Sequence, residues 1–339
     1  MTRRDRTTGL PKHRPRPVSK RERRVAGIPV RDWYSRVAIL GGVALLFLFV
    51  LGLVGYRWYD ENIGKPREVV LTVEGETFSL RYFTDRLGSF ALSNPQLGRG
   101  FIEPSLLTKL EEEAVTVRMA QEAGIDLSDE AVTQHIADEL GVEPGGSGTT
   151  FDSLYRQRLR ETGLRERDYR RLSRASLAEA ALLEQILDAI GGTGEVAELR
   201  TVVTSSEDNA HSIVERIGDG EDMAEIARTE SEDLASREEG GMMQEMPLQL
   251  LPEELRDAIA EAGEGDLVGP VQVQDHWWIV RAESIDPDGT LSDEHREQIA
   301  EQELEERISE ARQAADIERS LRDSHVSWAY RNVTIPGVN

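Results

Sequence analysis

The sequence predicts an α+β protein, in which a transmembrane helix precedes a mainly helical region that surrounds a compact α+β domain. Three observations support this fold class. Residues 37–56 contain no charged side chain and are long enough to cross a bilayer as a helix. Residues 67–192 and 291–330 carry apolar side chains at three- and four-residue intervals, which indicates amphipathic helices. Residues 196–285 instead alternate short strands with short helices, and a length of 339 residues accommodates both domains.

The apolar run Val37–Tyr56 is expected to be an uncleaved membrane anchor. It is longer than the apolar region of a cleaved signal peptide, it lacks a clear small-residue cleavage site, and aromatic residues flank it. The basic tail 1–36 holds 12 Lys and Arg against three acidic residues, whereas the rest of the chain holds 28 against 60. By the positive-inside rule, we expect a single-pass protein of the inner or plasma membrane. Its tail would lie in the cytoplasm and its bulk outside it, as in a periplasm.

The composition excludes several functional classes. The formal net charge of −23 disfavours a nucleic-acid partner, because phosphates bind to positive surfaces. The chain has no cysteine, which removes disulfides, thiolate nucleophiles and cysteine-based metal sites. Its six histidines are scattered without metal-ligand spacing, and no P-loop, H-E-x-x-H or G-x-S-x-G motif is present. We therefore expect no cofactor and no metal.

Caps and breaks place the elements of the helical region. Residues 69–78 alternate as two strands around a turn at 74–76, and Ser79 and Ser128 stand where helix N-caps are expected. The glycine-rich stretch 191–194 is the expected domain boundary. The last predicted helix is charged and has only a narrow apolar stripe, so we expect it to pack back on the helical region. Helices are expected at about 80–90, 104–123, 129–140, 151–162, 165–190 and 292–323.

The segment 196–285 is expected to fold as a separate α+β domain. A tight bend is expected at Gly240–Gly241, and a turn that includes His276 is expected at 274–276. Strands are expected at 197–204, 271–273 and 277–282, and helices at 207–217, 223–229 and 252–262.

Five short motifs keep a fixed order and spacing in this domain, namely Ala210–Val214, Gly220–Ala227, Ser231–Asp233, Gly240–Gly241 and Gly269–Val271. In this order they resemble the parvulin-type peptidyl-prolyl isomerases. The opening Val73–Glu76, followed by Phe78 and a helix, resembles the start of the SurA/PrsA-type chaperones. The resemblance implies a parvulin domain at 196–285 and, around it, a SurA-like helical region made of 67–192 and the returning 291–330.

The resemblance also implies a site made of two histidines and an Asp or Cys. Asp233 matches the Asp/Cys position. Thr201 stands where the first histidine is expected, or Arg200 if the alignment is one residue off, and Trp278 stands at the second histidine position. The polar centre of the family site is therefore mostly substituted in this chain.

The family site includes an apolar Met/Phe pocket for the proline ring. Leu251 and Leu255 stand at these two positions, and Met242 and Met243 follow the paired glycines where the family has Asp and Leu. Together with Trp278 they are candidates for an apolar substrate groove, since methionine-rich surfaces adapt to varied ligands. The alternative is that these residues are ordinary core and that Asp233 is an ordinary loop carboxylate.

What the resemblance implies about function is a folding factor that binds unfolded or newly translocated polypeptides. Weak or absent isomerase activity is expected, because both histidine positions are substituted. Two alternatives stay open at this point. The protein could be an active isomerase with a rewired site of Thr201, Asp233 and His276, or an accessory subunit that scaffolds a membrane protein complex.

Overall fold

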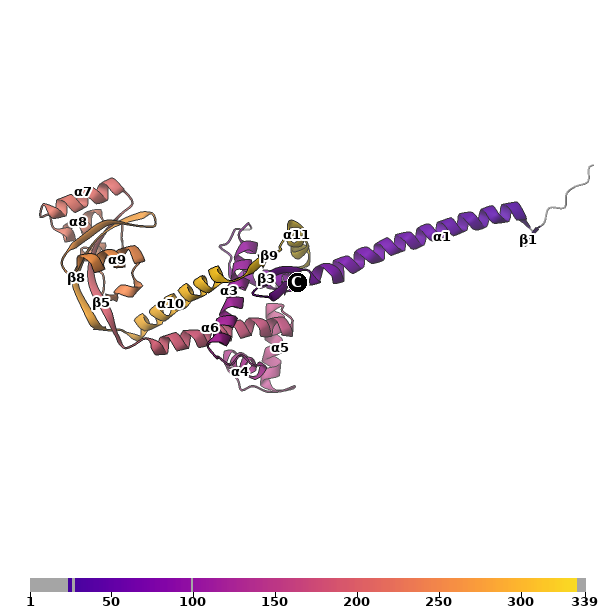
Figure 1. Cartoon of the computed structure of the whole chain (residues 1–339), viewed down its shortest axis with the longest axis horizontal. Helices are drawn as coiled ribbons and strands as arrows, with labels where there is room; N and C mark the ends of the chain where they lie inside the picture. Colours follow the sequence, from indigo (N-terminus) through magenta and orange to yellow (C-terminus); the bar gives the residue numbers. More distant parts are fainter. Residues whose placement is uncertain (1–23, 26–27, 99, 334–339) are drawn as a thin grey trace, which may run out of the picture. The chain divides into compact units, whose positions relative to one another are not determined.

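The computed structural model describes residues 24–25, 28–98 and 100–333 of the chain (Figure 1). Most of the predicted basic tail 1–36 therefore lies outside the described residues. The chain divides into two compact units, of which the first ends at Pro66 and the second begins at Arg67.

The first unit is dominated by α1 (Val30–Tyr59), which contains the predicted span 37–56. A short antiparallel pair, β1 (Arg24–Val25) and β2 (Ile28–Pro29), precedes it. Within the described residues, one helical stretch, Leu40–Arg67, is long and apolar enough to cross a membrane, and none of its apolar window is buried. A helix that exposes this much apolar surface suits a lipid environment better than water.

In the second unit, the helical region forms around a three-stranded antiparallel sheet of order β4-β3-β9. The predicted caps are confirmed, because the Ser79 and Ser128 hydroxyls accept hydrogen bonds from the backbone N–H groups of Tyr82 and Ala131, each at 3.3 Å. The elements are β3 (Val69–Val73), β4 (Glu76–Ser79), α2 (Leu80–Ser93), α3 (Ile102–Glu122), α4 (Asp129–Glu139), α5 (Thr150–Thr162), α6 (Glu166–Ala189), α10 (Asp293–Ala314), β9 (Ile317–Arg319) and α11 (Asp323–Asn332).

The single helix predicted over 292–323 is wrong at its C-terminal end. Helix α10 ends at Ala314, and the chain then adds β9 to the sheet, where Glu318 pairs with Thr72 of β3. The guanidinium of Arg319 binds the buried carboxylate of Glu111 through two hydrogen bonds of 2.6 and 2.7 Å. A pattern within the segment could not reveal this strand, because both partners lie about 200 residues or more away in the sequence.

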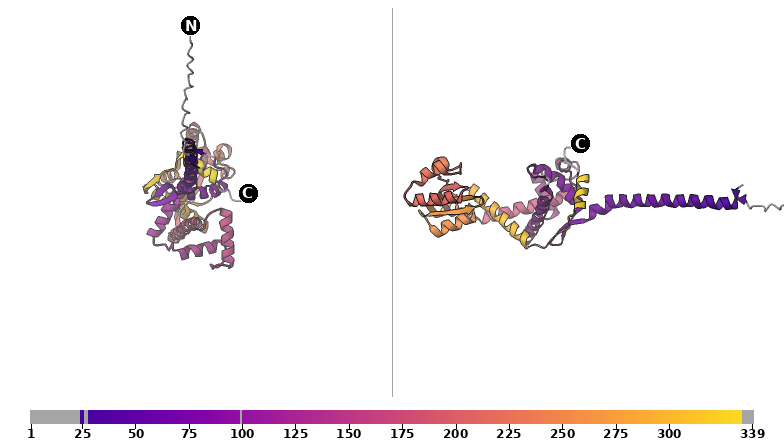
Figure 2. Two further views of the ribbon diagram at one scale, coloured as in Figure 1. Left: turned by 90° about the vertical axis from the view of Figure 1, so that its right-hand side faces the viewer. Right: turned by 90° about the horizontal axis from the view of Figure 1, so that it is seen from above.

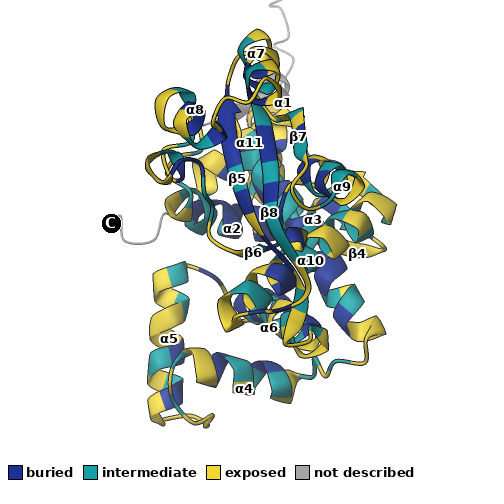
Figure 3. Cartoon of the chain, turned by 90° about the vertical axis from the view of Figure 1, so that its left-hand side faces the viewer, coloured by how far each residue is buried: buried dark blue, intermediate teal, exposed yellow. Residues whose placement is uncertain are grey.

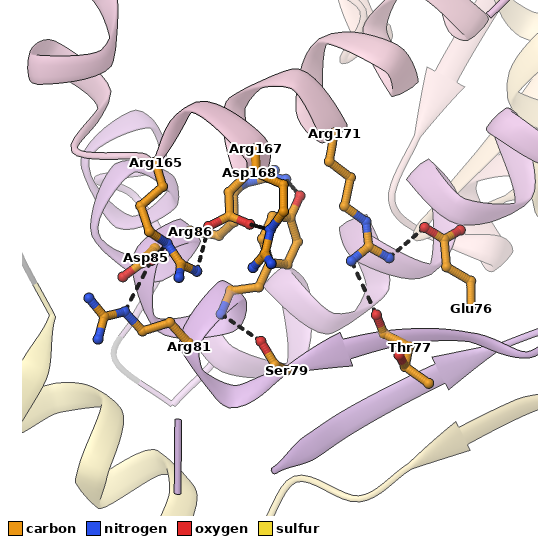
Figure 4. Close-up of polar contacts among 11 residues, drawn as sticks. Glu76, Thr77, Ser79, Arg81, Asp85, Arg86, Arg165, Arg167, Asp168 and Arg171 are labelled. Atoms are coloured by element: carbon orange, nitrogen blue, oxygen red, sulfur yellow. Dashed lines mark hydrogen bonds and ion pairs between the residues drawn. The ribbon is translucent and has the colours of Figure 1, made fainter. Parts of the chain in front are cut away.

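Ion pairs tie the beginning of α6 to α2 and β4 (Figure 4). Arg165 lies 2.5 Å from a carboxylate oxygen of Asp168 and 3.3 Å from one of Asp85, so a single guanidinium joins the two helices. Arg171 lies 3.6 Å above the Phe78 ring and reaches the Glu76 carboxylate at 2.5 Å. These contacts hold α6 in place along the sheet.

The second domain is built on a four-stranded antiparallel sheet of order β6-β5-β8-β7. Its two central strands pair antiparallel from Thr193↔Thr290 to Thr204↔Trp277, with two shifts of register on the way. The predicted boundary at 191–194 therefore overlaps the start of this long two-stranded ribbon. The elements are β5 (Thr193–Thr204), α7 (Glu207–Gly218), α8 (Met223–Glu230), β6 (Met246–Pro247), α9 (Glu253–Ala262), β7 (Leu267–Val273) and β8 (His276–Thr290).

Helices cover both faces of this sheet (Figure 3). Val202 of β5 and Ile279 of β8 belong to a core cluster with α7 and α8, whereas Leu199 and Val280 belong to a cluster with α9. Because side chains alternate along a strand, Thr201 and Val280, which pair with each other, lie on the α9 face. The predicted site residues of the two central strands are therefore brought to one face.

Candidate functional site

Thr201 lies in the middle of β5 and is almost completely buried, with 1 % of its surface exposed. Its backbone N–H donates to the carbonyl oxygen of Gly241 at 2.8 Å, which pins the glycine bend to the strand. Its hydroxyl oxygen lies 3.5 Å from that of Ser236, which is also buried. A neutral hydroxyl thus lies inside the domain at the position where the sequence resemblance leads us to expect the first histidine.

Asp233 lies in the loop that follows α8 and is joined to Thr201 through Ser236. One Asp233 carboxylate oxygen accepts a 2.5 Å hydrogen bond from the Ser236 hydroxyl, and the other accepts from the backbone N–H of Ala235 at 3.1 Å. Ser236 was not predicted as part of the site; the local signal there is the Asx turn of Asp233 onto the backbone N–H of Ala235, a turn that aspartate favours. Thr201 and Asp233 are therefore close, but the carboxylate mainly holds its own loop.

The paired glycines bring this loop against β5. Gly240 and Gly241 have φ values of +68° and +78°, which glycine adopts without strain. A Cβ atom at Gly241 would lie 2.2 Å from the carbonyl oxygen of Thr201. The close approach of the two backbones therefore requires glycine at this position.

The apolar candidates separate into core and surface residues. Leu251 and Leu255 are 5 % and 2 % exposed and belong to the core cluster under α9, and Met243 and Trp278 are partly exposed and pack against it. Met242 instead forms an isolated bridge opposite Arg200. The structure thus brings Leu251, Leu255, Met243 and Trp278 together, and the surface they offer to a ligand comes mainly from Met243 and Trp278.

His276 opens β8 opposite Val273, so the predicted turn is confined to residues 274–275. Its Nε2 atom lies 3.8 Å from a carboxylate oxygen of Glu232, the residue before Asp233. Hydrogen bonds from Ser205 lower the pKa of Glu232, and the nearby imidazole adds to this effect. Within the described ranges, no group of three or more histidine and carboxylate side chains is placed to hold a metal ion.

Comparison with known families identifies both domains. The model of the SurA-like N-terminal domain matches residues 31–183, and the model of the PPIC-type PPIase domain matches residues 198–284. The chain therefore combines a SurA-like N-terminal domain with a parvulin-type, or PPIC-type, peptidyl-prolyl isomerase domain, as the sequence motifs predict. The predicted fold class is confirmed as well.

Among individual relatives, the chain is similar to the foldase protein PrsA of Caldanaerobacter subterraneus, with 31 % identity over 91 residues. This segment makes up 27 % of the chain and 30 % of the foldase, so the match spans less than a third of that protein. A solved PrsA peptidylprolyl isomerase of Bacillus anthracis is 19 % identical, with 62 % of this chain and 94 % of that chain covered at a TM-score of 0.43. One of two SurA-like chaperones of Campylobacter jejuni is 17 % identical, with 55 % and 90 % covered at a TM-score of 0.27.

Proposed function

We propose that this protein is a membrane-anchored, extracytoplasmic folding factor that holds unfolded or newly translocated polypeptide and has weak or no isomerase activity. The two domain matches support a folding role, and the related PrsA is itself named a foldase. The exposed apolar helix α1 and the basic tail before it support an anchor whose N-terminus stays in the cytoplasm. The acidic body would keep such a protein soluble outside the membrane.

The main support for weak or absent isomerase activity is the burial of Thr201. Rotation about an X–Pro bond faces a barrier of about 20 kcal/mol, and an isomerase lowers it with polar groups that favour the twisted amide. Thr201 is 1 % exposed, so its hydroxyl has no access to a bound peptide. Trp278 offers apolar surface at the other histidine position but only an indole N–H as a donor.

A proline-limited refolding assay tests this proposal. We expect the full chain in detergent to leave the slow refolding phase of a substrate protein nearly unchanged, and Asp233→Asn to behave like the wild type. Asp266→Asn, which removes an exposed carboxylate of the same domain, is the matched control. A strong acceleration that Asp233→Asn abolishes and Asp266→Asn preserves would show a rewired active site instead.

Co-purification in mild detergent separates a folding factor from a scaffold. We expect a range of bound polypeptides that a denatured competitor protein displaces. A single partner at fixed stoichiometry, which unfolded protein does not displace, would support the alternative of an accessory subunit in a membrane complex.

A further inference from the structure

A cleft of about 800 Å³ opens between α3, α6 and α10, away from the parvulin-type site. The three helices pack against one another, and α10 runs beside α6 in different views (Figures 1 and 2). Apolar side chains of Leu183, Leu304 and Ile308 line part of the cleft and extend the core cluster beneath it. The volume lies within the range of sites that bind drug-sized ligands, and here it has an apolar base.

The walls of this cleft carry an excess of negative charge. Five glutamates line the cleft against one lysine and one arginine, and we therefore call it the acidic cleft. The five glutamates are Glu112, Glu113, Glu179, Glu301 and Glu305. The buried Glu113 is neutralised by Arg86 through hydrogen bonds of 2.7 and 2.8 Å. Arg312 also lines the cleft, and one of its guanidinium nitrogens lies 3.5 Å from a carboxylate oxygen of Glu111.

The other four glutamates remain available to a ligand. In the part of the chain that the structure describes, none of them has an ion pair within 4.0 Å, and Glu179, Glu301 and Glu305 are exposed. Burial raises the pKa of Glu112; Lys109 and Arg312 oppose this rise, and the Glu179 and Glu305 carboxylates add to it. Lys109 and Arg312 offset only part of the negative charge of the lining, so a further positive group that enters the cleft would find carboxylates to pair with.

A second cavity continues the acidic cleft across α6. It has a volume of about 520 Å³, lies among α4, α5 and α6, and shares Ser176 with the first cavity. Tyr169 and Leu172 give it apolar surface, and its charged lining residues are one carboxylate, Glu139, and one guanidinium, Arg158. Two adjoining cavities suit an extended chain better than a compact small molecule. Among the described residues, the carboxylates are not grouped in a way that would hold a metal ion.

We propose that the acidic cleft binds segments of unfolded polypeptide that combine basic with apolar side chains. Lysine or arginine of the client would lie against Glu179, Glu301 and Glu305, and its apolar side chains against Leu183, Leu304 and Ile308. This inference rests on the proposed folding function and adds the chemistry of the preferred client.

Fluorescence anisotropy with two designed peptides tests the inference on the full chain in detergent. The peptides have equal length and equal leucine content, and one carries arginine where the other carries glutamate. We expect binding of the arginine peptide only, and weaker binding as salt rises from about 0.05 M to about 0.5 M, because exposed charges are then screened. Glu179→Gln/Glu305→Gln should weaken binding about threefold to tenfold, as expected for the loss of two exposed ion pairs.

Glu238→Gln/Glu239→Gln is the matched control, because it removes the same charge from exposed positions of the other domain. Equal binding of both peptides, or equal loss in both double variants, would overturn the inference. So would binding of a peptide with the sequence of residues 1–23 together with no binding of the arginine peptide, which would assign the cleft to the chain's own basic tail.

A separate assay distinguishes this inference from the proposed function. The same preparations are tested for suppression of aggregation of a heat-unfolded client protein. Suppression without binding of the arginine peptide would overturn the inference and leave the folding function standing. Absence of suppression, in the wild type as in the variants, would contradict the folding function itself.

Discussion

The close backbone approach at Gly241 holds the loop that contains Asp233 against β5. Replacing Gly241 with alanine should cost about 1–2 kcal/mol for the left-handed backbone and about 1–3 kcal/mol more for overpacking. The added Cβ would meet the Thr201 carbonyl oxygen at 2.2 Å and Ala227 at 2.9 Å. We therefore expect a large loss in the free energy of unfolding, measured by urea denaturation of the full chain.

Gly220→Ala is the control, because Gly220 also has a positive φ, +99°, but a Cβ there would meet no atom within 4 Å. Gly220→Ala should lower the free energy of unfolding only by the backbone contribution, about 1–2 kcal/mol. Equal losses in the two variants would mean that the loop moves away from β5 at little cost, and that the approach does not fix the site.

At the scale of single residues, the sequence indicated which residues belong to one site but not which of them are buried. The family resemblance implied that Thr201 and Asp233 share a site, and hydroxyl contacts through Ser236 link the two side chains. Which candidates are covered depends on α9, whose packing on the sheet is a tertiary contact. Leu255 is buried for this reason, whereas Trp278 keeps some exposed surface.

Among the elements, β9 shows how a short strand closes the helical domain. It supplies Arg319, whose guanidinium satisfies the Glu111 carboxylate, and this carboxylate has no exposed surface. Removing one partner of a buried charge leaves the other uncompensated. Arg319→Ala should therefore lower the free energy of unfolding by about 2 kcal/mol, less than for a fully buried pair because Arg312 remains near Glu111.

Arg307→Ala is the matched control, since Arg307 pairs with Glu303 on the surface of α10 and should matter little. A double-mutant cycle with Glu111→Gln measures the coupling directly, and part of the loss should be recovered in the double variant. Independent, additive effects of Arg319→Ala and Glu111→Gln would contradict a direct role of this pair.

Elements with local signals were predicted well, and those with distant partners were not. Serine caps fixed the starts of α2 and α4, because the hydroxyl and the amides it satisfies are neighbours in sequence. The end of α10 and the lengths of β5 and β8 depend on pairing with remote strands. Local periodicity therefore extended the predicted helix past Ala314, where the chain instead pairs with β3 as β9.

For the molecule as a whole, charge and hydropathy divide the sequence into a basic tail, an apolar stretch and an acidic body. The tail 1–36 has an excess of nine positive charges, and the remaining residues have an excess of 32 negative charges. The apolar helix α1 stands between most of the tail and the acidic body in the sequence. Under the proposed topology, the charge on the two sides of α1, more than packing in the folded state, should therefore set the orientation of this protein.

The orientation can be tested by removing the positive charges that precede the apolar span. Residues 17–36 hold six Lys and Arg before the span, and Arg57, Lys65 and Arg67 follow it. Replacing those six residues with glutamine should reverse the bias and place a substantial fraction of molecules with the C-terminus in the cytoplasm. A C-terminal reporter that is active only outside the cytoplasm should be fully active in the wild type and clearly less active in this variant.

Replacing Asp60 and Glu61 with amides is the control and should change the orientation little, because acidic residues contribute weakly to it. A reporter that is inactive in the wild type, or unaffected by loss of the six basic residues, would contradict the proposed topology.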